Sequence, residues 1–544
     1  MTFSAGDDLG AAAAVGSDGR LSRREAVRRL CLLTVGSAVG ASLLTACDRS
    51  KPSSPASKRR YGPIDASTFA WPAGLIAMWD FQRDSAGANT VTSHIGSQAT
   101  TLTARGNKTV QKDTADPGPF GPSLDLDGAT VFVKDGDLGA LDVSTTGSQI
   151  TMVNWVNDVA RNHDDTGSGM AFRAGSHCEG GPGTARQYGS YFDGYFFLGP
   201  SHGHYTPAIV PQDGPTPGYP WNRDYAGSAR KYFTGVGQGQ WHMEAFTYDG
   251  HQIVAYIDGL ADIWKDVPEP EPTQPGFTLH QTVNRNPYVL DKPVNGSPTT
   301  KRFTIGGVVL GDPPDYPGFN FTKGKLGGVA VFDRALTAEE IMAIRLGTLR
   351  LGEPITTYSF EMSAPGAHPL KDIGWTAKEG PNCIDVSDSV VESYHVVRPD
   401  RAPKAFLQRT STLIGATWVP LSGLSSTQVD EVRFKLASAK PSAAAQRLLV
   451  RVGDKWWASE ASYTSKSVQP EVPDWSGADS AKHTMSWDKG QWRQVTIDDG
   501  QALSIATGSN QESITAGPLQ AIGFISEGGD GSAVRVTDLE LLPV

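Results

Sequence analysis

Short segments of alternating or apolar residues, separated by turn residues, restrict the fold of this chain more than any other feature. Before residue 352 they lie at 75–81, 123–133, 149–156, 191–198, 242–248, 253–257, 303–309 and 326–332. Dipeptides that favour tight turns punctuate them, namely Asp127-Gly128, Asp249-Gly250 and Asp258-Gly259. The sequence also contains 61 Gly and 36 Pro residues, which suits a chain with many turns. This pattern predicts an all-β fold of antiparallel sandwiches.

A break near residue 352 divides the predicted strands into two series. A short helix is expected just before it, because Thr337 begins a capping box that Glu340 completes. Gly352-Glu353-Pro354 then interrupts the pattern, and further strand segments follow at 355–361, 431–436, 447–452, 491–497, 521–525 and 533–542. A chain of this length is too long for one hydrophobic core, so we expect one sandwich over residues 64–351 and another over residues 352–544.

The N-terminus has the order of an export signal. A basic stretch at 21–29 precedes an uncharged apolar run at 30–44, which is too short to cross about 30 Å of hydrocarbon. The next residues, Leu44-Thr45-Ala46-Cys47, resemble a bacterial lipobox. The resemblance implies a signal peptide over residues 1–46 and a diacylglycerol group attached to the sulfur of Cys47. A single N-terminal membrane helix is the alternative.

Two neighbouring segments fit the same interpretation. Ser22-Arg23-Arg24 resembles the twin-arginine export signal, although Ala26 stands where that signal usually has a large apolar residue. Residues 47–63 are polar and rich in Pro and Ser, which is typical of a flexible tether. We therefore expect an exported lipoprotein, held by its lipid anchor in a membrane and facing the periplasm or the cell surface.

Charge and cysteine content exclude some partners. The formal net charge is −10, and no stripe of Lys and Arg interleaved with aromatic residues is present, so nucleic acid is not an expected partner. With Cys31 in the signal peptide and Cys47 lipidated, only Cys178 and Cys383 remain. Two scattered cysteines cannot make a zinc site, and they are either one disulfide or two free thiols.

Several motifs of the first series resemble the laminin-G-like branch of the concanavalin A-like lectin/glucanase fold. The motifs are Gly239-Gln240-Trp241-His242, the segments 246–250 and 256–259, and the closing segment 324–341. The resemblance implies a sandwich framework over residues 75–345. Members of this superfamily bind sugars or proteins, often with calcium, and others cleave polysaccharides on the same sandwich. A divalent cation such as calcium is therefore a candidate cofactor, although no Asp-rich calcium loop is present.

The second series resembles jelly-roll carbohydrate-binding modules. The resemblance rests on Trp456, Trp457, Trp492 and the final segment 534–541. It implies that Trp456 and Trp457 are candidate glycan-binding residues, because the C–H face of a sugar ring stacks on an aromatic ring. The alternative is that all three tryptophans belong to the hydrophobic core.

Two long insertions interrupt the first predicted sandwich, and binding sites often lie on such loops. The candidates for binding or catalysis that they contain are Tyr188, Tyr195, His202, His204, Trp221, Arg223, Tyr225 and Arg230 in the insertion at 176–232, and Asn284 and Arg285 in the insertion at 266–300. In a strand, His202 and His204 would point to the same side, which would allow a divalent metal site. Plain polar loop residues are the alternative.

Glu244 is a further candidate. Alternation along the strand at 242–248 places His242, Glu244, Phe246 and Tyr248 on one face. A carboxylate among apolar neighbours must be paired or must change its pKa, and both outcomes are common at functional sites. A structural ion pair with an arginine is the alternative.

Three functions fit these features. The first is a surface, lipid-anchored protein that binds an extracellular or cell-wall glycan. The second is a polysaccharide lyase or glycoside hydrolase that uses the insertion-lined cleft of the first sandwich. In a lyase, arginines and Asn284 would neutralise a uronate while a His or Tyr takes the proton, and in a hydrolase Glu244 would pair with Asp193 or Asp224. The third is protein adhesion or a structural role in the envelope. The sequence does not identify the glycan.

Overall fold

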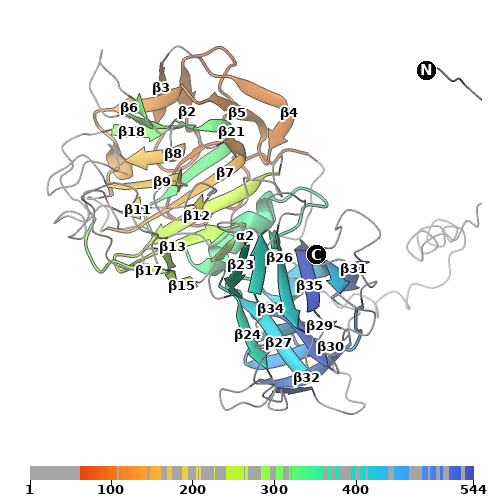
Figure 1. The fold of residues 1–544 in the computed structure, drawn as a ribbon. Helices are drawn as coiled ribbons and strands as arrows, with labels where there is room; N and C mark the ends of the chain where they lie inside the picture. The colour runs from red at the N-terminus through yellow and green to blue at the C-terminus, as the bar shows by residue number, and fades with distance from the viewer. Residues whose placement is uncertain are drawn as a thin grey trace, which may run out of the picture. The chain divides into compact units, whose positions relative to one another are not determined.

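The computed structural model of the protein describes residues 62–544, apart from 107–108, 144–147, 161–167, 174–186, 194–203, 206–207, 210–225, 227–239, 262–263, 268–283, 295–301, 310–317, 320, 359–365, 371–373, 380–393, 398–404, 411–413, 439–445, 465–480, 488–490, 498–502, 506–513 and 528–532. The predicted signal peptide, Cys47, Cys178 and Cys383 lie outside the described residues. Antiparallel strands dominate the described chain, which confirms the predicted all-β fold (Figure 1).

The first sandwich consists of two antiparallel sheets. Sheet 1 has the order β14 (Leu260–Ala261), β13 (Gln252–Ile257), β12 (His242–Tyr248), β7 (Ile150–Ala160), β21 (Lys323–Phe332), β5 (Gly121–Asp127) and β4 (Lys112–Gly118), with β1 (Leu75–Trp79) beside β21 and β17 (Tyr288–Val289) beside β13. Sheet 2 has the order β10 (His204–Tyr205), β9 (Tyr188–Asp193), β8 (Ser168–Arg173), β18 (Arg302–Ile305), β6 (Val131–Asp135), β3 (Thr101–Arg105) and β2 (Thr90–Thr92), with β11 (Ala208–Ile209) beside β9.

Tight turns lie between strands of the first sandwich where the sequence predicted them. Asp258 and Gly259, between β13 and β14, have φ angles of 51° and 81°. Positive φ at both central positions is the requirement of the hairpin turn for which Asp-Gly is favoured. Gly128 and Gly250 of the other two predicted turns also have positive φ, at 80° and 92°.

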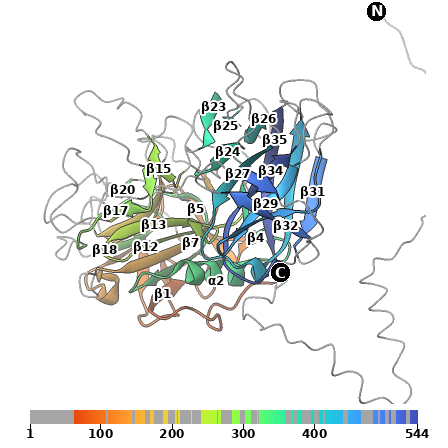
Figure 2. The same ribbon diagram turned by 90° about the horizontal axis from the view of Figure 1, so that it is seen from below.

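Helix α2 (Ala338–Thr348) covers the outer face of sheet 1 (Figure 2). Its N-terminus is closed by the predicted capping box, in which the Thr337 side chain accepts from the backbone N–H of Glu340 and the Glu340 carboxylate accepts from the backbone N–H of Thr337. Arg334 adds two bonds to the same carboxylate, at 2.8 and 2.5 Å. Ile341 and Ile344 of the helix then pack with Trp155 and Met243 of the sheet.

Both faces of sheet 1 are therefore buried. Phe246 and Tyr248 of β12 belong to the core between sheets 1 and 2. Met243 and Ala245, which alternate with them, belong to the core under α2. This arrangement confirms the predicted alternation for these four residues of β12.

The second sandwich also consists of two antiparallel sheets. Sheet 3 has the order β23 (Gly366–Pro369), β25 (Tyr394–Val397), β26 (Ala405–Thr410), β35 (Ala533–Pro543), β28 (Val429–Ser438) and β31 (Ala481–Ser486), with β22 (Thr356–Tyr358) beside β35. Sheet 4 has the order β24 (Thr376–Glu379), β27 (Ile414–Pro420), β34 (Leu519–Glu527), β29 (Gln446–Val452), β30 (Lys455–Ser459), β32 (Trp492–Ile497) and β33 (Leu503–Ile505).

Short remaining elements complete the described chain. They are the two-stranded pairs β15 (Trp264–Val267) with β16 (Asn284–Asn286) and β19 (Val308–Val309) with β20 (Gly318–Phe319), and the 3-10 turns η1 (Gly139–Leu141) and η4 (Ser426–Gln428). Within the part of the chain that the structure describes, no helix is long and apolar enough to cross a membrane.

Candidate functional site

The two faces of sheet 4 differ in how they are covered. One set of side chains lies in the core that sheet 4 shares with sheet 3, including Val419, Leu448, Val450 and Trp457. Successive residues of a strand point to opposite faces, so their neighbours Trp418, Leu449 and Trp456 lie on the outer face. We call this outer face, with its half-buried tryptophans, the aromatic face.

Two tryptophan rings meet above the aromatic face. The ring centroids of Trp418 and Trp456 are 5.0 Å apart and the ring planes are 65° apart, which is an edge-to-face contact. Trp418 lies on β27 and Trp456 on β30, and strands β34 and β29 separate them. The two side chains therefore reach toward each other across two strands.

Gly523 allows the backbone of β27 to lie close to β34. It lies on β34, opposite Trp418 on one side and Leu449 on the other. A Cβ atom at this position would lie 1.9 Å from the carbonyl oxygen of Thr417 and 2.5 Å from the Cα of Trp418. Only glycine therefore fits here without a shift of the backbone of β27.

Buried apolar side chains form the floor beneath the rings. They are Ala416, Leu449, Ala458, Val495 and Ile525, and all are buried. Trp418, Trp456 and Ile497 pack against them and remain partly exposed. The tryptophan rings thus cover the floor with one part of their surface and present the other part to solvent.

Arg451 lies beside Trp456 on the same face. The two residues are directly opposite each other on β29 and β30, and the guanidinium carbon is 5.8 Å from the centroid of the indole ring. This distance is within the range of a cation–π interaction. The Nε atom of Arg451 is buried and has no hydrogen-bond partner.

The other two arginines of the aromatic face have partners. Arg493 forms a bidentate pair with Glu460, and this hydrogen bonding lowers the pKa of the Glu460 carboxyl. Arg447 donates to the backbone carbonyls of Ser459, at 3.0 Å, and Glu460. Among the described residues, Arg451 therefore differs from these two arginines in that its Nε atom has no hydrogen-bond acceptor.

The two predicted glycan-binding residues of the second sandwich, Trp456 and Trp457, lie on opposite faces of sheet 4. Trp457 is 3% exposed and lies in the core between the sheets, as does Trp492, so the core alternative holds for these two residues. Trp456 points outward. The sequence pattern does not predict Trp418 or Arg451 as binding residues. It indicates no strand around Trp418, and it indicates Arg451 only as one residue of the strand segment 447–452.

Few of the first-sandwich candidates can be placed. Tyr195, His202, Trp221, Arg223, Tyr225 and Arg230 lie outside the described residues. His204 belongs to the backbone of β10, where it pairs with Asp193, and Asn284 and Arg285 belong to β16. Tyr188 is buried, and its hydroxyl donates to the carbonyl of Leu141 at 2.8 Å. That bond gives Tyr188 a structural role at this position.

Glu244 lies inside the first sandwich. Its side chain is 0% exposed and shares the inner face of β12 with Phe246 and Tyr248. Across the sheet it is opposite Asn154, whose amide donates to the hydroxyl of Ser190 at 2.6 Å. The carboxylate thus belongs to a buried polar group between sheets 1 and 2 and does not line an open cleft.

A second buried polar group lies next to α2. Asp258 accepts from the backbone N–H of Met243 at 3.0 Å, lies 3.0 Å from Nδ1 of His242 and forms an ion pair with Arg345 at 3.3 Å. Arg345 also donates to the carbonyl of Ile355 at 3.0 Å. These groups line a hollow of about 230 Å³, and their contacts connect the β13–β14 turn to the segment after α2.

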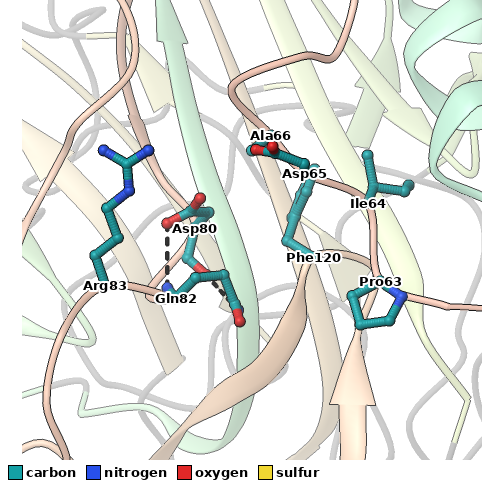
Figure 3. A pocket seen from close by; sticks show the side chains of 8 residues that line it. All are labelled: Pro63, Ile64, Asp65, Ala66, Asp80, Gln82, Arg83 and Phe120. Carbon is teal, nitrogen blue, oxygen red and sulfur yellow. Dashed lines mark hydrogen bonds between the residues drawn. The ribbon is translucent and has the colours of Figure 1, made fainter.

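Another hollow, of about 270 Å³, lies at the edge of the first sandwich (Figure 3). Its polar lining includes Asp65, Asp80 and Arg83. Asp80 accepts from the backbone N–H of Gln82 at 3.1 Å, and bonds from Ser67 lower the pKa of Asp65. Within the described ranges, no group of three or more His, Cys, Asp or Glu residues is placed to hold a metal ion.

Comparison with known proteins gives structural similarity alone. No family model matches the sequence, and no curated protein matches it. Domain 4 of AbnA, a GH43 extracellular arabinanase from Geobacillus stearothermophilus solved with arabinotriose, is 14% identical, with a TM-score of 0.30, over 50% of this chain and 98% of that one. The binding domain of botulinum neurotoxin DC, solved with SialylT, is 8% identical, with a TM-score of 0.29, over 87% of this chain and 99% of that domain.

A Trypanosoma rangeli sialidase in complex with difluorosialic acid is also similar in structure. It is 14% identical, with a TM-score of 0.27, over 51% of this chain and 33% of the sialidase.

Proposed function

We propose that this protein binds glycans through the aromatic face of its C-terminal sandwich. The observation that carries the proposal is the pair of partly exposed tryptophans, Trp418 and Trp456, whose ring centroids are 5.0 Å apart above a floor of apolar residues. The apolar C–H faces of sugar rings stack on such indole rings, while nearby polar groups bond to the hydroxyls. Arg451 supplies hydrogen-bond donors beside Trp456.

The position of the rings supports binding rather than a purely structural role. A sandwich stabilises itself by burying tryptophan between its sheets, as Trp457 and Trp492 do. A rigid sheet that presents two partly exposed indole rings together forms an apolar surface of the kind that usually marks an interaction site. Protein adhesion would use the same rings, and the experiment below separates the two functions.

Affinity gel electrophoresis of the full chain, purified in mild detergent, tests the proposal against a panel of neutral and acidic polysaccharides. Retention by at least one polysaccharide is expected, and Trp418→Ala and Trp456→Ala should each reduce it by roughly tenfold, since stacking on one ring contributes about 1 kcal/mol or more. The matched control is Tyr463→Ala, which removes a partly buried ring from the same sandwich away from the aromatic face. Equal losses in all three variants would contradict the proposal.

The same incubations test the enzymatic alternative. New reducing ends with ultraviolet-absorbing unsaturated products would establish a lyase, and reducing ends without them a hydrolase. The sequence-predicted candidates would be substituted next, Glu244→Gln for a hydrolase, and His202→Ala and Arg223→Ala for a lyase. Retention without products leaves the binding function alone for that panel.

We further propose that the chain is exported and anchored through a lipid on Cys47, as its lipobox-like motif suggests. The expected result is incorporation of a labelled fatty acid and recovery of the protein in the membrane fraction. Cys47→Ala should abolish the label and release the protein if the signal peptide is cleaved. A variant that loses no label would contradict lipidation, and an unlabelled wild type that stays in the membrane would indicate an N-terminal membrane helix instead.

A further inference from the structure

The charge distribution around Trp456 narrows the class of ligand. Among the described side chains, three arginines and one glutamate lie on this part of the aromatic face, namely Arg447, Arg451, Arg493 and Glu460. Glu460 is already paired with Arg493, and backbone carbonyls satisfy Arg447. The face therefore carries a local positive charge on a chain whose formal net charge is −10.

Arg451 is the origin of that local charge. A guanidinium whose Nε atom is shielded from water and makes no hydrogen bond loses hydration without compensation, which is unfavourable. The contact with Trp456 offsets part of this loss and holds the guanidinium in place, because cation–π attraction positions it over the ring. The two Nη nitrogens of the same guanidinium are the donors that a ligand on this face would meet.

We infer that the aromatic face selects acidic glycans that carry carboxylates, such as polyuronates, with Arg451 as the residue that binds the carboxylate. The inference rests on the proposed glycan-binding function. A carboxylate is planar, and the end of a guanidinium that carries the two Nη nitrogens donates two parallel bonds to it. A sugar ring stacked on Trp456 would bring an equatorial substituent to the neighbouring Arg451, since the two side chains are cross-strand partners.

The test compares polyuronates with neutral polymers of the same backbone. The probes are polygalacturonate, alginate and hyaluronan, each beside its carboxyl-reduced form, with a sulfated neutral polymer to separate sulfate from carboxylate. We expect the full chain to bind at least one polyuronate at least tenfold more tightly than its reduced form. Arg451→Gln should remove most of that difference, because the affinity for the polyuronate should fall more than the affinity for the reduced polymer.

Two further variants separate geometry from charge. Arg451→Lys keeps the positive charge but loses the planar guanidinium that donates two parallel bonds. It should therefore retain only a minor part of the preference for the polyuronate over its reduced form. Lys455→Gln removes one positive charge from the exposed end of the adjacent strand and should change affinity little. Equal losses in Arg451→Gln and Lys455→Gln would indicate non-specific attraction and overturn the inference.

The remaining outcomes distinguish the two proposals. Equal binding of a polyuronate and its reduced form, abolished by Trp456→Ala, would overturn the acidic preference and leave glycan binding in place. Tighter binding of the sulfated polymer than of every polyuronate would overturn the choice of carboxylate. If no polymer binds, or if Trp456→Ala changes nothing, both proposals fail.

Discussion

Sheet 1 and sheet 4 both place tryptophan on their outer faces, but only one of these faces is covered by a helix. Trp155 on sheet 1 is 1% exposed, and its indole N–H donates to the hydroxyl of Thr348 in α2 at 3.1 Å. Trp418 and Trp456 on sheet 4 are partly exposed, and among the described residues no helix lies over them. The comparison teaches that an aromatic residue on an outer sheet face becomes either core or binding surface according to what covers it.

The position of helix α2, which covers sheet 1, depends on a short stretch of local sequence. The capping box at Thr337 and Glu340 determines where α2 begins, and this start places Ile341 and Ile344 over the sheet. The aromatic face has a different local specification, since Gly523 allows β27, which carries Trp418, to lie close to β34. Substitutions at these positions therefore act on one sandwich at a time.

The largest expected effect is loss of the covered tryptophan. Trp155→Ala should lower the free energy of unfolding of the first sandwich by about 3–5 kcal/mol, because it removes a large side chain packed against Phe120 and α2. Trp418→Ala is the matched change on the uncovered face and should cost no more than about 1–2 kcal/mol. Denaturant unfolding followed by circular dichroism measures both, and equal losses would break the distinction between the two faces.

Gly523→Ala should have the next largest effect. The new Cβ would meet the carbonyl oxygen of Thr417, so β27 must shift, at a cost of about 1–3 kcal/mol. The shift also moves Trp418, and glycan retention should fall with stability. Gly517→Ala is the control, because its Cβ would meet only a Val452 methyl carbon at 3.3 Å. A stable Gly523→Ala variant with normal retention would show that the close approach is not required.

Thr337→Ala tests how much the capping box contributes to the stability of α2 on the covered face. Removing the capping hydroxyl should destabilise α2 and the first sandwich by about 1 kcal/mol. Thr337→Ser keeps the hydroxyl and should recover most of that loss. Neither change should alter glycan retention, which is the readout that separates the two sandwiches.

The smallest effect concerns pH. Hydrogen bonding to Arg334 lowers the pKa of Glu340 in the folded state, so the pair stabilises the fold above the ordinary glutamate pKa of about 4.3 and this contribution is lost as the pH falls. Glu340→Gln keeps a capping acceptor and removes the charge. It should cost a few tenths of a kcal/mol at neutral pH and nothing once wild-type Glu340 is protonated. A loss of unfolding free energy in Glu340→Gln, relative to wild type, that grows as the pH falls would contradict this prediction.

Periodicity predicted the fold better than the site. The alternation of β12, the Asp-Gly turns and the capping box depend on local sequence, and all three appear as predicted. Trp456 and Trp457 show the limit, since alternation separates them to opposite faces but does not say which face is the core. That decision depends on sheet 3, which packs on the Trp457 side.

The partner of Trp456 could not be predicted for a further reason. Trp418 is 38 positions earlier in the chain, and the two rings meet only because β34 and β29 lie between their strands. Strand order is a long-range property that one sequence does not reveal. Glu244 shows the opposite outcome, a residue that the sequence predicts as a site candidate but that does not line an open site. Its carboxylate stands out in the strand pattern, yet it is fully buried between two sheets.

Fluorine NMR of the protein labelled with fluorotryptophan tests the central claim most directly. The resonances of Trp418, Trp456, Trp457 and Trp155 would be assigned by single Trp→Phe changes and followed while a polysaccharide retained in the affinity gels is added. Glycan binding at the aromatic face predicts that the Trp418 and Trp456 signals shift in a saturable way while those of the buried Trp155 and Trp457 stay in place. Saturable binding that leaves Trp418 and Trp456 unchanged would contradict the account.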